Sequence, residues 1–293
     1  MAATLQRVRA MRAGDLLVQS LVLFLAGVAA AIVVVIGVYL FLESAPLLTG
    51  TGMLDFFRDQ RWYPLEGEFG MAAMLAGTLS VTALAMLLAA PVGIAAAVFI
   101  RYYAPPAVAI FYRRLLELLS GIPSVVFGFW GLVVLVPLIA KLEGPGASVL
   151  AGALVLGLMI LPLVSLSTDS SLAQVPRNYW LAGTALGLGR WAIVRKVMIP
   201  AAAPGILAGM VLQTGRALGE TMALLMVTGN VVQWPSSVFE PVRALTSNIA
   251  LEMAYATGDH RTALFVSGLI LLVMTAGMVA LAALIQRRLR RYA

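Results

Sequence analysis

The sequence has no cysteine and a single histidine, His260, and these two shortages exclude much chemistry. Without cysteine the chain has neither disulfides nor thiolate metal sites. One histidine also argues against a histidine-based metal centre or a Ser-His catalytic pair. A membrane-embedded hydrolase would need a nucleophile with a base, or a set of metal ligands, so it is the weakest function class here. We expect no catalytic residue, no metal and no cofactor.

Lysine is almost as scarce, because the only two are Lys141 and Lys196 and neither follows a glycine. The phosphate-binding P-loop has the form GxxxxGK[ST], which therefore occurs nowhere in the chain. The chain does not hydrolyse ATP by a P-loop. If its activity is ATP-driven, another polypeptide must be the motor.

Charge is also rare, at 11% of residues, whereas 61% are hydrophobic and the mean hydropathy is +0.98. Soluble domains carry about 25% charged residues, so the composition predicts an all-α, polytopic membrane protein. The net charge of +7 then reflects basic loops on one side of the membrane, so the charge is counted for each loop separately. We expect no nucleic-acid partner. About 20 apolar residues span a bilayer. Six stretches qualify, at roughly 16–42, 70–100, 115–139, 148–168, 201–228 and 263–286.

The basic residues between these stretches alternate strictly from side to side. Fourteen fall on one side, namely Arg7, Arg9, Arg12, Arg101, Arg113, Arg114, Arg177, Arg190, Arg195, Lys196, Arg287, Arg288, Arg290 and Arg291. Five fall on the other, namely Arg58, Arg61, Lys141, Arg243 and Arg261. Basic loops stay in the cytoplasm, so both termini are predicted to be cytoplasmic. Residues 43–69 and 229–262 then form the external loops.

A charged pair, Arg216 and Glu220, stands inside the fifth apolar stretch, where an unpaired charge is costly. On a continuous helix the i,i+4 spacing lets the two side chains pair. They share a helical stripe that should face protein or a water-filled cavity, composed of Gly205, Gly209, Leu212, Arg216, Glu220 and Ala223. The pair either locks this helix to a neighbour or forms an anion site. In the second case the Arg216 guanidinium binds an oxyanion and Glu220 holds it when no solute is present.

The third stretch contains Gly121 and Pro123, which together predict a kink. Gly121, Ser124, Gly128 and Gly131 recur at helical spacing and form a narrow, slightly polar stripe. Such a stripe either packs closely on another helix or lines a passage. We take Ser124 and Gly128 as candidate pathway residues beside Arg216 and Glu220.

Residues 174–200 form the longest cytoplasmic connection, "QVPRNYWLAGTALGLGRWAIVRKVMIP". Pro176 suits the first turn of a helix, and Gly187 and Gly189 interrupt the pattern that follows. The segment predicts a short surface helix, a turn and a second basic segment. It either lies in the lipid interface or serves as a handle for a cytoplasmic partner.

Taken together, these motifs resemble one family, the membrane permease of the phosphate-specific ABC importer, in its PstC-type form. The resemblance runs from about Trp62 to the last helix. It is carried by Trp62-x-Pro64, Phe69-Gly70, "ELLSGIPSVVFGFWGL" (117–132), "MILP" (159–162), "ALG" before "RW" (185–191) and "GRALGETMALLMVTGN" (215–230).

The resemblance implies a type I ABC importer fold and a set of partners. The partners are a second, PstA-type permease, two cytoplasmic ABC ATPase subunits and an extracytoplasmic phosphate-binding protein. The expected division is an N-terminal segment with the first helix and an external loop at 1–69, then the permease domain at 70–293. The domain contains a cytoplasmic coupling loop at 169–200, and the chain lies in the inner membrane.

The family's charged pair maps onto Arg216 and Glu220, and its ATPase-coupling motif maps onto the loop around Gly187. The implied coupling residues are Arg177, Tyr179, Leu181, Ala182, Gly183, Ala185, Leu186 and Gly187. The chain departs from the family pattern at two positions, because Leu181 stands where a glutamate is usual and Gly183 replaces an alanine. The remaining alternatives are a permease for another oxyanion such as sulfate, and an ATP-independent anion carrier or channel.

Overall fold

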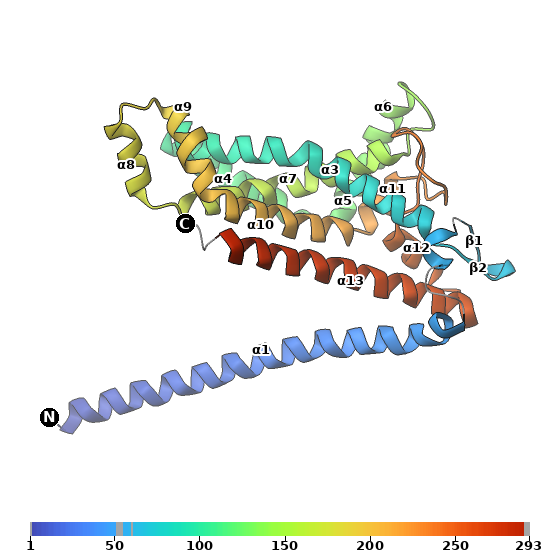
Figure 1. The fold of residues 1–293 in the computed structure, drawn as a ribbon, viewed down its shortest axis with the longest axis horizontal. Coiled ribbons are helices and arrows are strands. Elements are labelled where there is room, and N and C mark those ends of the chain that lie inside the picture. The colour runs from blue at the N-terminus through green and yellow to red at the C-terminus, as the bar shows by residue number, and fades with distance from the viewer. Residues whose placement is uncertain (1, 51–54, 60, 290–293) are drawn as a thin grey trace.

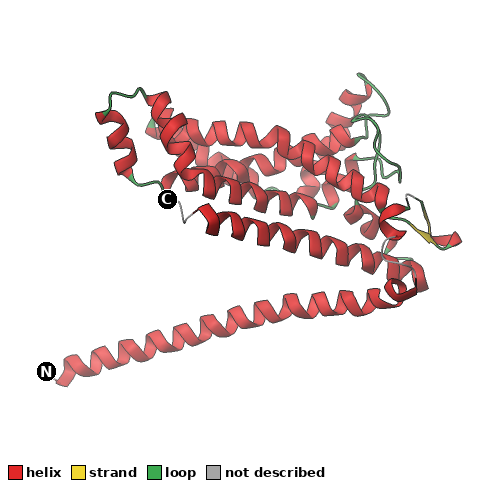
Figure 2. Cartoon of the chain, in the orientation of Figure 1, coloured by secondary structure: helices red, strands yellow, loops and turns green. Residues whose placement is uncertain are grey.

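The computed structural model describes residues 2–50, 55–59 and 61–289, which form an elongated helical bundle (Figure 2). Arg290 and Arg291 lie outside the described residues, as do the side chains of Arg7, Arg9, Arg12, Arg58 and Arg288. The first half contains α1 (Ala2–Gly50), α2 (Asp55–Arg58), β1 (Trp62–Tyr63), η1 (Pro64–Glu66), β2 (Glu68–Phe69), α3 (Ala72–Val98), η2 (Phe99–Tyr103), α4 (Pro106–Ser120), α5 (Ser124–Trp130), η3 (Gly131–Leu135) and α6 (Val136–Ala140). The second half contains α7 (Val149–Ala173), α8 (Arg177–Ala185), α9 (Arg190–Ile193), η4 (Val194–Met198), α10 (Ile199–Leu218), α11 (Met222–Val227), α12 (Leu245–Glu252) and α13 (Gly258–Leu289).

Five helical segments are long and apolar enough to cross a membrane. They are Val18–Thr49, Ala72–Tyr103, Val149–Ala173, Arg190–Leu218 and Gly258–Arg287. A sixth candidate is the bent pair Pro106–Ser120 and Ser124–Ala140, whose halves meet at 89°. The prediction of six spans in an all-α protein is therefore confirmed when this bent pair is counted as one span. The predicted kink lies at 121–123 as expected, although 89° is a sharp corner rather than a bend.

The core is built where α3 and α7 lie side by side. Their contact is close because it uses small residues: a Cβ on Gly93 would stand 2.8 Å from Val164 Cγ1, and one on Gly157 would touch the Ala85 backbone. Small residues let helix backbones approach within lipid, where packing replaces the hydrophobic effect as the driving force. As a result, 61% of the most apolar window of α7 is buried inside the protein.

The first helix, α1, is peripheral. None of its most apolar window is buried in the protein, so its Leu, Val and Ile side chains are exposed to the bilayer. Figure 1 shows α1 meeting the bundle beside α13 at one end and diverging from it toward the N-terminus. The meeting point includes an edge-to-face contact between Tyr39 and Phe265, with ring centroids 5.7 Å apart. This helix is attached to the bundle but contributes little to its core.

The two ends of the bundle differ. One end carries the start of α1, the α8–α9 segment and the end of α13, and the opposite end carries the β1–β2 hairpin, α12 and α6 (Figure 1). The hairpin is antiparallel, with Trp62 opposite Phe69, and it turns through η1 and Gly67, whose φ is +76°. The basic segments predicted to share one side thus lie at the same end of the molecule.

Candidate functional site

The fifth span is not the continuous helix 201–228 that the sequence predicts. Helix α10 ends at Leu218, residues 219–221 break it, and α11 begins at Met222. Gly219 caps α10 with its amide donating to the carbonyls of Ala217 and Arg216. Broken helices at membrane depth occur where the free backbone groups are buried in protein or line a cavity, and they mark ion and solute sites in transporters. Arg216 therefore lies one turn before the break, and Glu220 lies within it.

The expected Arg216–Glu220 ion pair is wrong for this structure. In the part of the chain that the structure describes, the Arg216 side chain makes no ion pair or hydrogen bond and is exposed. The break is the reason, because it removes Glu220 from the i+4 position of a continuous helix. The Glu220 carboxylate instead caps α11, with Oε1 accepting a hydrogen bond from the Ala223 amide at 3.2 Å. Arg216 lies in the last turn of α10, where the helix dipole favours a cation.

Helix α12 is hydrogen-bonded to the break. The Thr246 hydroxyl donates to the carbonyl oxygen of Glu220 at 2.7 Å. The Leu245 amide, at the start of α12, donates to the Thr78 hydroxyl of α3 at 2.9 Å. These bonds satisfy two backbone groups at or near the break, and they tie the break through α12 to α3.

Residues of the predicted stripe on α10 pack against α7, and some of them also line a groove. Gly205 and Gly209 face α7, where added Cβ atoms would stand 2.7 Å from Ser171 Oγ and 2.9 Å from Ser167 Oγ. Both glycines and Leu212 also line a groove of about 740 Å³ beside α8, whose wall includes Lys196. Arg216 lies further along the same helix and outside this lining.

The third-span stripe is largely a packing surface. Gly128 is buried, and a Cβ there would stand 2.9 Å from the Ala223 Cα of α11. Gly131 packs equally closely on Val155 of α7. Ser124 is half-buried and begins α5 after the Pro123 cap. This favours close packing for Gly128, and the pathway role of Ser124 and Gly128 stays a prediction.

The 174–200 segment has the predicted form of a short helix, a turn and a second helical segment. Helix α8 ends in a Schellman motif: the Leu188 amide donates to the Gly183 carbonyl at 3.1 Å and the Gly187 amide to the Thr184 carbonyl at 3.0 Å. Gly187 occupies the left-handed position, with φ of +73°. The outer surface of the segment exposes most of the predicted coupling residues, namely Arg177, Tyr179, Leu181, Ala182, Ala185, Leu186 and Gly187.

Gly183 alone among the predicted coupling residues is buried, and the structure explains why it is a glycine. A Cβ there would stand 2.9 Å from Ile193 Cγ1 of α9. An alanine would push α8 away from α9. The departure from the family pattern at Gly183 therefore lets α8 lie closer to the segment that leads into α10.

Comparison with known proteins establishes the family to which the chain belongs. Residues 89–291 match the family described as "Binding-protein-dependent transport system inner membrane component". The chain belongs to this family. It is thus a multi-pass inner-membrane transport subunit and not an enzyme. An ABC importer permease acts with a partner permease, an ATPase and a substrate-binding protein, so this permease is one part of a larger complex.

Several curated relatives cover most of the chain. A probable ABC transporter permease protein, YqgH of Bacillus subtilis, is 38% identical over 89% of this chain and 86% of its own. Phosphate transport system permease proteins named PstC are 34% identical in Mesorhizobium japonicum, over 87% and 86%, and 30% identical in Haemophilus influenzae, over 93% and 91%. Among solved structures, an inward-facing conformation of the MetNI methionine ABC transporter aligns with a TM-score of 0.57 at 19% identity, over 78% of this chain and 99% of the other. That likeness confirms the fold.

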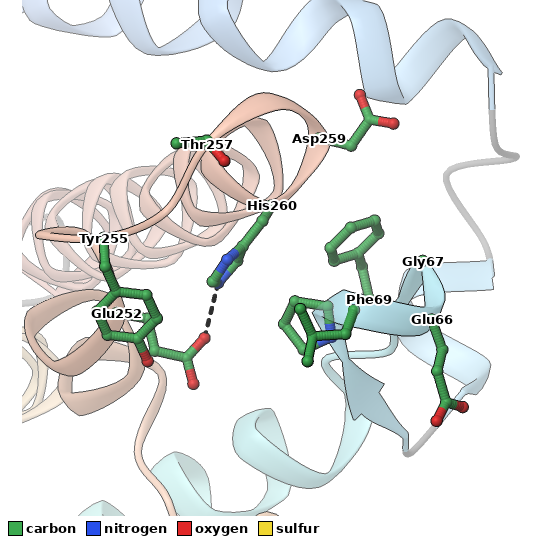
Figure 3. Close-up of a pocket in the computed structure, with 10 residues that line it drawn as sticks. Glu66, Gly67, Phe69, Glu252, Tyr255, Thr257, Asp259 and His260 are labelled. Carbon is green, nitrogen blue, oxygen red and sulfur yellow. Dashed lines mark hydrogen bonds and ion pairs between the residues drawn. The ribbon is translucent and has the colours of Figure 1, made fainter.

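Sequence reasoning missed a buried ionic network at the end of this permease that carries α12 and the β1–β2 hairpin. Glu252 of α12 accepts from Arg243 Nη1 at 2.6 Å and from Trp62 Nε1 at 2.8 Å, and its Oε2 lies 2.8 Å from His260 Nε2. Glu252 is only 7% exposed. Figure 3 shows Glu252 and His260 facing each other beside a pocket that also includes Phe69 and Glu66. His260 belongs to the first turn of α13 and not to a loop, and its partner is Glu252 rather than the adjacent Asp259.

Replacing Glu252 tests how much this network contributes to the stability of the protein. Glu252→Ala removes the shared acceptor and leaves the mostly buried Arg243 without its carboxylate, a loss that typically costs about 3 kcal/mol. We expect a clearly lower unfolding midpoint for the purified chain in detergent. Asp259→Asn is the matched control, because Asp259 is exposed and forms no ion pair within the described residues. Equal midpoints for the two variants would show that the network is dispensable.

A second carboxylate near α12, that of Glu240, orders the loop before this helix. It accepts hydrogen bonds from the Ser236 amide at 2.9 Å and from the Ser236 hydroxyl at 2.8 Å. These bonds, the amide bond first, hold the pKa of Glu240 below its ordinary value. The contribution of this contact is complete above the ordinary carboxylate pKa and is lost as the pH falls through the lowered value.

Proposed function

We propose that this chain is the PstC-type permease subunit of an ATP-driven importer for inorganic phosphate. It forms half of the translocation pathway with a PstA-type permease, and two cytoplasmic ABC ATPase subunits and an extracytoplasmic phosphate-binding protein complete the complex. The observation that carries this proposal is the set of relatives named PstC, which are 30–34% identical over most of both chains.

The geometry at the break supports an oxyanion as the solute. Arg216 keeps its charge at every relevant pH and presents a planar fork of donors that matches a tetrahedral oxyanion. Its side chain is exposed and has no hydrogen-bonding or ionic partner among the described residues. Glu220 is engaged in capping α11 and forms no ion pair with the guanidinium among the described residues. We infer that Arg216 interacts with solute passing between the two permeases.

Alternating access follows if the ATPases move α8. Solute delivered at the external face enters while the permeases open outward, and nucleotide-driven closure of the motor reverses the opening. The exposed residues Tyr179, Leu181 and Leu186 offer apolar side chains on different sides of α8 for this contact. Leu181 offers no charge where the family pattern has a glutamate, so the contact at this position rests on apolar packing.

Vesicles test the function directly. The tagged chain, co-purified with its partner subunits and reconstituted, should take up labelled phosphate only when ATP and the binding protein are supplied. Excess unlabelled sulfate should leave the uptake unchanged. Strong competition by sulfate would indicate a permease for another oxyanion. Uptake that persists without ATP would instead support an anion carrier or channel.

The lack of cysteine allows a clean test of the proposed orientation, with both termini cytoplasmic. Leu65, at the hairpin tip, and Leu186, after α8, are 104% and 79% exposed. In intact cells a membrane-impermeant maleimide should label the Leu65→Cys variant at once. It should label the Leu186→Cys variant only after the membrane is permeabilised. The unsubstituted chain is the blank, and the reverse labelling pattern would invert the topology.

A further inference from the structure

The cytoplasmic end of α3 is a π-helical turn, η2, whose consecutive side chains reach three different elements. Arg101 Nε lies 2.6 Å from Asp169 Oδ1 of α7. Tyr102 stacks on Trp180 of α8, with ring centroids 5.3 Å apart and planes within 3° of parallel. The Arg190 guanidinium of α9 lies 5.8 Å from the centroid of the Tyr103 ring. π-Helical turns insert an extra residue into a helix and are frequent at functional sites.

The ionic part of this arrangement anchors η2 firmly to the bundle. Asp169 is 7% exposed and binds two arginines, because Arg113 of α4 also donates from Nε to its Oδ2 at 2.8 Å. A buried carboxylate with two guanidinium partners is costly to separate from them. The end of α3, the middle of α4 and the end of α7 therefore behave as one unit at this point.

Helix α8 contacts the rest of the protein at two separate places on one face. Gly183 packs on Ile193, which leads through η4 into α10. Trp180, three residues earlier and so on the same side of the helix, stacks on Tyr102. Two attachment points prevent α8 from pivoting about one of them, so a displacement of α8 must be shared between α10 and α3.

The far end of α3 connects onward to the break beside Arg216. Thr78, near the start of α3, accepts the hydrogen bond from the Leu245 amide of α12. The next residue, Thr246, donates to the Glu220 carbonyl within the break. A continuous series of packed and hydrogen-bonded groups thus runs from α8 along α3 to α12 and the proposed solute site.

We propose that the Tyr102–Trp180 stack is a second mechanical link between α8 and the membrane helices, through which movement of α8 reaches α3 and, by way of α12, the break beside Arg216. Tyr102 and Trp180 are positioning residues in this role, since neither touches the proposed solute site. The proposal rests on the proposed function, in which the ATPases act on α8. It adds a route through α3 to the direct connection from α8 through α9 into α10.

The number of phosphate ions taken up per ATP hydrolysed by the reconstituted complex tests this link. An aromatic pair contributes about 0.5–1.5 kcal/mol beyond its buried area, so Tyr102→Ala or Trp180→Ala should lower the ratio about 3- to 10-fold. Both substitutions act on one contact, so the double variant should be no worse than the poorer single variant. Tyr102→Phe keeps the ring and should retain the wild-type ratio. Trp191→Ala is the control, because Trp191 is an exposed tryptophan of α9 that lies outside the stack.

The outcomes separate the link from the function it serves. An unchanged ratio in Trp180→Ala, or additive losses in the double variant, overturns the link. If Trp180→Ala fails to assemble with the ATPases, Tyr102→Leu replaces it. This variant removes the stacked ring from α3 and leaves α8 unaltered, so its uptake ratio tests the same contact. A wild-type complex that takes up no phosphate overturns the proposed function, and the variants then have no ratio to change.

Discussion

Arg216→Ala should lower ATP-driven phosphate uptake by about 10- to 100-fold while the complex still assembles, because a hydrogen-bonded contact to a charged group contributes about 1.5–3 kcal/mol. The side chain is exposed and makes no hydrogen bond or ion pair in the described part of the chain. Its removal should therefore cost the fold little. The two measurements are the initial uptake rate, which should fall, and the co-purification of the partner subunits, which should be unchanged.

Two further variants refine the interpretation of this result. Arg216→Lys keeps the charge but loses the planar fork, so uptake should fall between the wild type and the alanine variant. Arg287→Ala removes one positive charge from an exposed position at the end of α13 and should transport normally. Wild-type uptake by Arg216→Ala would refute the anion-site role. Equal losses of uptake in Arg216→Ala and Arg287→Ala would show that only the net positive charge of the chain matters, and not the position of Arg216.

The sequence predicts spans, kink and surface helix well because each rests on local chemistry. Long apolar runs are set by bilayer thickness, Pro123 removes a backbone donor, and Gly187 supplies the left-handed turn. The break at 219–221 was not predicted, although Gly219 lies within it. Its stability depends on Thr246, which is 26 residues away from Glu220 in the sequence, so no local pattern reveals it.

The ionic clusters escaped prediction for the same reason. Asp169 binds arginines 56 and 68 residues earlier in the chain, and Glu252 bonds Trp62 across 190 residues. Charge counting assigns such residues to a side of the membrane but does not pair them. One signal was available for Asp169. An acid at the end of an apolar span, next to segments rich in arginine, is expected to have a cationic partner. The fold was thus predictable, whereas the partners of its charged groups were not.

Gly187→Val should uncouple transport from ATP hydrolysis, because the Schellman turn that ends α8 requires a left-handed residue. A β-branched residue at φ of +73° costs about 1–3 kcal/mol. No atom outside the turn lies within 4 Å of a Cβ added there, so sterics with neighbouring elements do not contribute. The turn should open, α8 should change direction, and uptake per ATP should fall about 5-fold or more for a cost in this range.

Gly189→Val provides a matched control two residues away. A Cβ there also meets nothing within 4 Å, but the φ of Gly189 is −67°, which any residue adopts. Both variants add the same side chain to the same exposed turn and differ only in backbone conformation. Loss of coupling in Gly187→Val with normal coupling in Gly189→Val would assign the effect to the direction of α8. If the two variants behave alike, the turn at Gly187 does not contribute to coupling. Movement of the ATPases must then reach the membrane helices through another element.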